Sequence, residues 1–116
     1  MKPNEKLEAV FFRSGTGVEP VRDWLKGLKE DQRKAIGVDI RTAQYGWPLG
    51  MPLIRKLESS LWEVRTKFRN GIARTLFTVD GNRIVLLHGF IKKTQKTPPN
   101  ELQTARRRLR KYLETS

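Results

Sequence analysis

The chain has 116 residues, 37% of them hydrophobic, which suits one folded domain that we expect to span residues 1–116. It has no cysteine and one histidine, which excludes disulfides and Cys-ligated metals, and we expect neither a metal nor a cofactor. No apolar stretch approaches the about 20 residues of a membrane span, and no signal-peptide pattern opens the chain. We therefore expect a cytoplasmic protein without a membrane partner.

Positive charge is the most informative part of the composition. The chain holds 24 Lys and Arg against 12 Asp and Glu, for a net charge of +12. Residues 1–53 carry nine basic and seven acidic side chains, a balance of +2, whereas residues 54–116 carry fifteen and five, a balance of +10. This concentration favours a polyanionic partner such as nucleic acid, bound by the C-terminal half. A basic protein with no such partner is the alternative.

The first half predicts one strand and two helices. Residues 7–12 are a short apolar run typical of a strand. Residues 18–28 place apolar side chains at helical spacing with Pro20 in the first turn, and a second helix begins at about Asp31 and stops at Gly46. The Gly- and Pro-rich residues 46–52 predict a loop.

In the second half the apolar period changes from helical to alternating. Residues 61–68, 72–79 and 83–91 predict three strands, joined by tight turns at Asn70-Gly71 and Asp80-Gly81. Thr97 before two prolines predicts the N-cap of a last helix. We therefore predict an α+β fold of order β-α-α-β-β-β-α: a small, mostly antiparallel sheet with a helical hairpin on one face and a C-terminal helix.

Alternation along residues 61–68 places Glu63, Arg65 and Lys67 on one strand face, opposite aromatic and aliphatic side chains. Arg74 interrupts the apolar pattern of the next strand and needs a partner or a route to water. It either pairs with Glu63 across the strands, or it belongs to a concave basic surface that grips a phosphate.

The single histidine and a lysine cluster lie on or after the last predicted strand. His88 has an ordinary pKa suited to acid–base work, but we place it on the face of Ile84, Leu86 and Phe90, where a histidine is more often a packing residue. Three lysines follow and either lie beside the basic surface or form a solvated loop: Lys92, Lys93 and Lys96.

Four segments resemble a known family: Leu61-Trp62-Glu63-Val64-Arg65, Gly71-Ile72-Ala73-Arg74, residues 84–94 and Lys96-Thr97-Pro98-Pro99, with LLHGFIKKTQKTPP the most restrictive stretch. They resemble the HigB-type toxins, a phage-derived branch of the RelE/ParE superfamily of bacterial toxin–antitoxin systems. The resemblance implies a RelE-like fold and a metal-independent endoribonuclease, an mRNA interferase that cleaves mRNA on the translating ribosome. The implied partners are mRNA, the ribosome and a helix-turn-helix antitoxin.

The resemblance also implies a site. Related ribonuclease toxins carry basic residues on the strand equivalent to residues 61–68, an arginine on the next strand and basic residues after the last. RNA cleavage by the 2′-OH needs that proton removed, the phosphoryl charge neutralised and the leaving 5′-oxygen protonated. The candidate catalytic residues are Glu63, Arg65, Lys67, Arg74, His88, Lys92 and Lys93, with Arg74 neutralising charge and Glu63 an alternative base. The candidate RNA-binding residues are Arg55, Lys56, Arg69, Lys96, Arg106, Arg107 and Arg110.

One part of the family pattern is absent. Several relatives carry a Tyr or His near the C-terminus for proton transfer, but this chain has no aromatic residue between Ile91 and Tyr112. Two other functions stay open: a gyrase-directed toxin of the ParE type, and an RNA-binding module that holds phosphates without cleaving.

Overall fold

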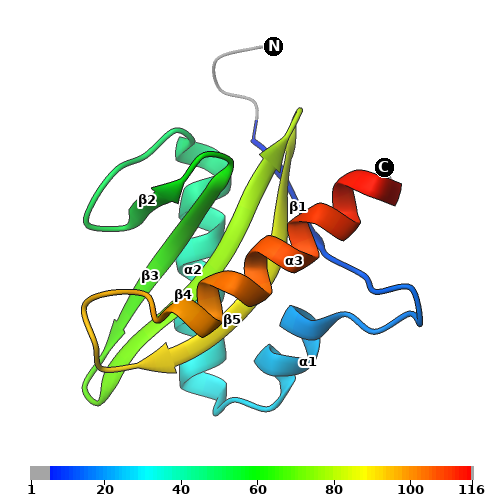
Figure 1. The fold of residues 1–116 in the computed structure, drawn as a ribbon. Helices are drawn as coiled ribbons and strands as arrows, with labels where there is room; N and C mark the ends of the chain where they lie inside the picture. The colour runs from blue at the N-terminus through cyan, green and yellow to red at the C-terminus, as the bar shows by residue number, and fades with distance from the viewer. Residues whose placement is uncertain (1–5, 116) are drawn as a thin grey trace.

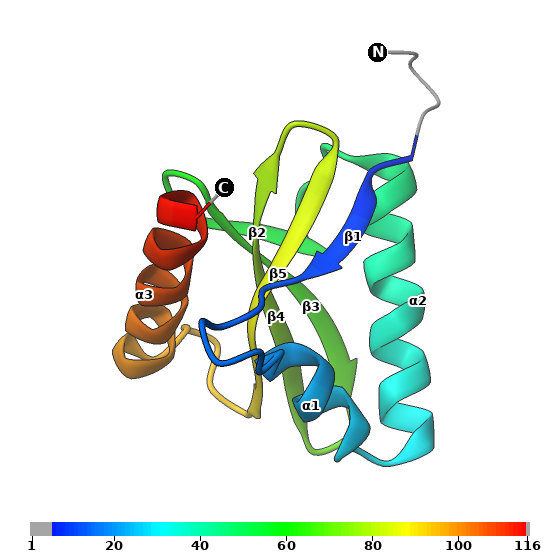
Figure 2. The ribbon, with the colours of Figure 1, turned by 90° about the vertical axis from the view of Figure 1, so that its right-hand side faces the viewer.

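The computed structural model describes residues 6–115. These residues form three helices and a five-stranded sheet of order β1-β5-β4-β3-β2. β1 (Glu8–Phe11) runs parallel to β5 (Arg83–Lys92), and β4 (Gly71–Asp80), β3 (Leu61–Phe68) and β2 (Ile54–Glu58) follow as antiparallel neighbours. The sheet lies between α1 (Pro20–Lys26) and α2 (Glu30–Gly46) on one side and α3 (Pro99–Thr115) on the other (Figures 1 and 2). The predicted α+β class is confirmed.

Two apolar layers hold the helices to the sheet. Under α1 and α2, residues such as Val21, Ile36 and Phe77 form one buried cluster, completed by Trp47 and Trp62. Under α3, the second cluster contains Leu61, Leu76, Val85, Leu87 and Ala105. Among residues 6–115, no helix is both long and apolar enough to cross a membrane.

The predicted order lacks one strand, because β2 lies within a segment that showed no alternating pattern. β2 is a short strand at the edge of the sheet, and its pairing with β3 shifts register between Lys56 and Glu58. Ile54 lies on the α2 side and Leu57 on the α3 side, as regular alternation gives. After the shift the next residue, Glu58, also reaches α3 through its contact with Arg106. An irregularity of this kind breaks the period of two on which a strand prediction depends.

A second irregularity corrects the predicted orientation of His88. β5 pairs with β4 from Arg83 to Leu86, and the register then shifts so that His88 faces Leu76. The extra residue, Leu87, moves the following side chains to the other face of the sheet. His88 therefore lies on the α3 side with Phe90, whereas Ile84 and Leu86 lie under α1 and α2.

Gly89 follows the bulge and permits close packing of α1 on the sheet. A Cβ built at this position would overlap the six-membered ring of Trp24. Since Trp24 belongs to the apolar layer under α1, no side chain at position 89 can be accommodated without moving the Trp24 ring or the helix that carries it.

We expect Gly89→Ala to lower the free energy of unfolding by at least about 1–3 kcal/mol, the usual cost of forcing extra volume into a packed core. Urea unfolding monitored by tryptophan fluorescence measures it. Gly37→Ala is the matched control, because a Cβ there meets no atom within 4 Å and alanine stabilises a helix interior by about 1 kcal/mol relative to glycine. Equal stability of Gly89→Ala and the unmodified chain would contradict this packing.

Candidate functional site

Two arginines lie opposite each other at the centre of the candidate site. Arg65 of β3 and Arg74 of β4 are direct register partners on the α3 side of the sheet. Their exposed fractions are 5% and 0%. The two arginines share a face, but other groups cover that face, so it is not the concave basic surface that was one of the two alternatives for Arg74.

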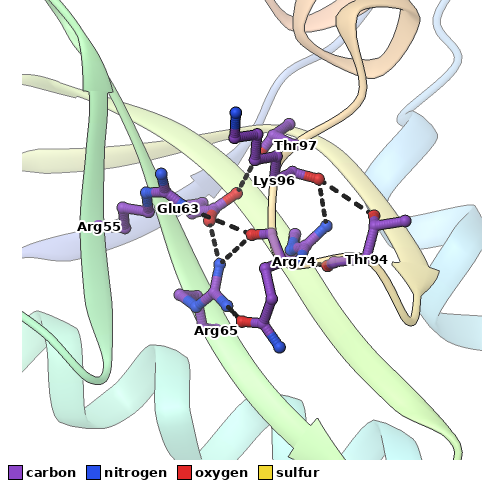
Figure 3. A network of polar contacts seen from close by, with 8 residues as sticks. Arg55, Glu63, Arg65, Arg74, Thr94, Lys96 and Thr97 are labelled. Atoms are coloured by element: carbon purple, nitrogen blue, oxygen red, sulfur yellow. Dashed lines mark hydrogen bonds and ion pairs between the residues drawn. The ribbon is translucent and has the colours of Figure 1, made fainter.

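The cover is the loop between β5 and α3, residues 93–98. Arg74 donates through Nη1 to the Lys96 carbonyl oxygen at 3.2 Å and through Nη2 to the Thr94 carbonyl oxygen. The Gln95 carbonyl oxygen accepts from Arg55 at 3.2 Å and from Arg65 at 3.5 Å. Three arginines from three neighbouring strands thus converge on the main-chain oxygens of one loop (Figure 3). We call this arrangement the loop-capped site.

Glu63 is the carboxylate of the loop-capped site, and it is fully buried. Its Oε2 accepts a hydrogen bond from Arg65 Nη1 at 2.8 Å, and its Oε1 accepts one from the Thr97 hydroxyl at 2.6 Å (Figure 3). The sequence predicted that Thr97 caps the N-terminus of α3. In the structure its hydroxyl instead ties the loop to Glu63 of β3. The pair expected between Arg74 and Glu63 is replaced by one between Arg65 and Glu63.

The surroundings of Arg74 disfavour its positive charge. Burial lowers the pKa of Arg74; the Glu63 carboxylate opposes this shift, and the positive charges of Arg65 and Arg55 add to it. An arginine nevertheless keeps its proton in proteins. Its Nε has no hydrogen-bond partner within residues 6–115, and the Phe90 ring lies 5.7 Å from its Cζ. A ligand with strong acceptor oxygens would suit this environment better than the loop carbonyls do.

Beside the loop-capped site lies an open groove of about 430 Å³ at the β3–β4 turn. Its lining includes the exposed cations Lys67, Arg69 and Lys93 and no carboxylate, and Gln95 belongs to both the groove and the cap. We call it the hairpin groove. It brings two predicted catalytic lysines and one predicted RNA-binding arginine into one accessible positive surface.

The structure places His88 in a network with α3. Its Nε2 lies 2.7 Å from Glu101 Oε1, and its Nδ1 lies 3.1 Å from Arg108 Nη1, which also donates to the Leu87 carbonyl oxygen. Because Arg108 can only donate, Nδ1 is the unprotonated nitrogen and Nε2–H donates to Glu101. Burial and the charges of Arg108 and Arg107 lower the pKa of His88, against the opposing effect of Glu101. A neutral histidine so engaged joins α3 to the sheet.

Lys92, a candidate catalytic residue, and Tyr112, the aromatic residue of the C-terminal helix, are also engaged elsewhere. Lys92 lies 3.1 Å from the second oxygen of Glu101. The Tyr112 hydroxyl donates to Asp80 at 2.6 Å, and burial together with that carboxylate raises its pKa. Asp80 ends β4, six residues and about 20 Å of strand beyond Arg74. Tyr112 therefore cannot replace the proton-transfer group of the relatives.

The predicted RNA-binding residues fall into separate places. Lys56 lies over the Trp62 ring on the α2 side, away from the loop-capped site. Arg106 is held by both carboxylate oxygens of Glu58, which lowers the pKa of Glu58. Arg55 and Lys96 join the loop-capped site, Arg69 the hairpin groove, and Arg107 and Arg110 line grooves along α3.

Sequence reasoning missed Thr94, Gln95 and Thr97, which supply the oxygens and the hydroxyl that close the site. They lie inside the most restrictive stretch of the resemblance, where only the lysines carry a charge and were therefore named as candidates. It also missed Arg108, a half-buried arginine that joins α3 to Leu87 and His88 of β5.

The fold and this site define a small basic α+β protein with a cluster of arginines closed by a loop. The chain belongs to the family described as phage derived protein Gp49-like (DUF891), whose model matches residues 23–110. This is a toxin-type family related to the RelE toxin superfamily. The matched range includes every candidate site residue named above. A comparison with curated proteins finds no match.

The network around His88 predicts how stability depends on pH. A folded-state pKa below the ordinary value of about 6.5 means that the unfolded chain binds more protons, so stability falls as the pH is lowered through 6.5 toward the folded pKa. The slope of the free energy of unfolding against pH approaches but does not exceed about 1.4 kcal/mol per pH unit. Urea midpoints between about pH 7 and pH 5 measure it, and His88 is the only histidine.

His88→Gln is the control, since glutamine cannot gain the proton, and we expect its slope in this range to be flatter. The pKa shift of Glu101 affects stability only at lower pH. Burial alone would raise the pKa of Glu101, but the hydrogen bonds from His88 and Lys92 lower it below 4.5. Stability that rises on acidification in the unmodified chain would show that a charged His88 pairs with Glu101 instead.

Proposed function

We propose that this chain is the toxin of a toxin–antitoxin system and acts as a metal-independent endoribonuclease on mRNA, in the manner of the HigB-type toxins with a RelE-like fold. The observation that carries the proposal is the convergence of Arg55, Arg65 and Arg74 on three carbonyl oxygens of one loop. Membership of a toxin-type family and the adjoining hairpin groove support it.

In this proposal the loop carbonyls occupy the positions that phosphoryl oxygens take when RNA binds. Guanidinium groups bind phosphate through paired N–H donors, with stronger hydrogen bonds than they form to neutral carbonyls. The loop moves aside, and Arg74 then neutralises the charge that develops on the phosphorus centre. The exposed Lys67 and Lys93 hold the neighbouring backbone in the hairpin groove.

Movement of the loop also supplies the base. Thr97 leaves Glu63 Oε1 when the loop opens, which frees that oxygen to accept a proton. Glu63 removes the 2′-OH proton, the O2′–P bond forms, and the P–O5′ bond breaks. A groove lysine, Lys67 or Lys93, donates a proton to O5′, so the products are a 2′,3′-cyclic phosphate and a 5′-hydroxyl.

The biological setting follows from the same proposal. The single domain of residues 1–116 acts in the cytoplasm on the translating ribosome and is inhibited by a helix-turn-helix antitoxin. The balance of +10 over residues 54–116 supports fast association with an acidic inhibitor.

We expect Arg74→Lys to lower the cleavage rate by about 10²–10³-fold and to abolish growth arrest, because lysine keeps the charge but not the forked donors. Mapping of RNA 5′ ends after induction measures cleavage. Arg33→Ala is the control, as an exposed arginine on α2, and circular dichroism shows that each variant folds. Full cleavage by folded Arg74→Lys refutes the assignment. Growth arrest by the unmodified chain without new 5′ ends favours a binding module, and arrest with DNA damage favours a gyrase-directed toxin.

The loop movement has its own test by hydrogen exchange. A 2′-O-methyl oligonucleotide cannot be cleaved, and we expect it to speed amide exchange in residues 93–97 while slowing exchange at the β3–β4 turn, which lines the hairpin groove. In Arg74→Lys the acceleration should shrink, since the phosphate has lost its forked partner. Protection of residues 93–97 by the oligonucleotide would mean that RNA binds over a closed loop.

A further inference from the structure

A second basic pocket lies farther along α3, away from the loop-capped site. It has a volume of about 480 Å³ and lies between the segment joining β1 to α1 and the outer part of α3. Its lining includes Ser14, Thr16 and Val18 from the first segment and Arg107, Arg108 and Lys111 from the helix. We call it the α3 pocket. In Figure 1 the β1–α1 segment lies on the right-hand side of α3, opposite the side on which β2 lies.

The charge of the α3 pocket is uncompensated. Its lining contains three cations and no carboxylate, and Glu114 lines only the adjoining groove that shares Arg107 and Lys111. Burial and the positive charge of Arg107 lower the pKa of Arg108. On the opposite side of the same helix, Arg106 is matched by Glu58. The helix therefore has a neutralised arginine toward β2 and a cluster of like charges toward β1.

Two features give the pocket a fixed geometry before any ligand binds. Arg108 is anchored by the Leu87 carbonyl oxygen and by His88. Opposite it, the Ser14 N–H donates to the Val18 carbonyl oxygen at 2.7 Å, the Gly17 N–H donates to the Ser14 carbonyl oxygen at 3.0 Å, and Gly17 has a φ of +88° that suits glycine.

The two hydroxyls of this turn leave one proton available for a ligand. Ser14 Oγ accepts the Val18 N–H at 3.1 Å and lies 3.1 Å from Thr16 Oγ1. With one lone pair of Ser14 occupied in this way, the hydroxyl pair retains a proton for an acceptor in the pocket. Cations on one wall and hydroxyl donors on the other match a phosphodiester, which accepts through several oxygens.

We propose that the α3 pocket binds a backbone phosphate of RNA at a second point, remote from cleavage. The proposal rests on the proposed function for the identity of the polyanion. About 12 Å of helix separates the start of α3 from Arg107, so the pocket holds RNA that the loop-capped site does not reach. Ser14 and Thr16 precede the family-matched residues 23–110, so this wall of the pocket lies outside the family match.

The test is the salt dependence of binding to a 2′-O-methyl oligonucleotide, which requires no cleavage. Each phosphate contact to a single strand contributes about 0.7 to the slope of log K against log salt concentration, so loss of the one phosphate contact in Arg107→Ala/Lys111→Ala should reduce that slope by about 0.7. Arg33→Ala/Lys34→Ala on α2 removes the same charge and should leave the slope unchanged. Equal slopes for the two double variants, together with equal affinities for purified ribosomes, would overturn the proposal.

Further arms identify the source of the phosphate. If the double variant loses affinity for a long oligonucleotide but not for a short one, the phosphate belongs to the continuation of the bound strand. If it loses affinity for purified ribosomes but for neither oligonucleotide, the phosphate belongs to ribosomal RNA. Either result supports the pocket. Unchanged RNA binding with weaker binding of poly-glutamate would refute it in favour of an acidic protein. Arg74→Lys, which removes cleavage, should keep the same slope change, so failure of the nuclease proposal and failure of the pocket are distinguishable.

Discussion

The burial of two arginines between β3, β4 and one loop is the constraint on which the rest of the site depends. A guanidinium keeps its charge, and removing it from water is costly unless acceptors replace the water. Arg74 finds them in the carbonyl oxygens of Thr94 and Lys96, while Arg65 takes Glu63 and Gln95. The loop is therefore held by the same groups that we propose bind the substrate, and binding and loop position cannot be independent.

The apolar pattern predicted most of the fold, and it failed where the strands are irregular. Alternation located β3, β4 and β5, and helical spacing located α1, α2 and α3. At Leu87 one extra residue changes the side to which His88 points, and because Leu86 and Leu87 are both apolar, the sequence carries no sign of it. A period of two shows which residues share a face only while the register is continuous.

The charged residues in the sequence indicated where the candidate site lies, but not whether it is open or covered. The alternation of β3 correctly placed Glu63 and Arg65 on one face, yet a face can be open or covered, and the covering groups here are main-chain oxygens, which have no sequence signature. The arginines of α3 show the same limit. They look equivalent in a run of basic residues, but successive residues of a helix point about 100° apart. Arg106 therefore meets Glu58, Arg108 meets β5, and Arg107 faces the α3 pocket.

The choice of partner decides which arginines remain available to a ligand. The bidentate contact of Glu58 neutralises Arg106, so a phosphate at that position would have to displace a carboxylate of comparable charge. A carbonyl oxygen is a weaker acceptor that leaves the guanidinium charge in place, and a phosphate can replace it with a gain in hydrogen-bond strength. Arg74 donates to the carbonyl oxygens of Thr94 and Lys96, so it is held in place while its charge is not neutralised by a direct partner. Neutral partners at Arg74 thus preserve an anion site in the closed state, which a carboxylate bound directly to that arginine would abolish.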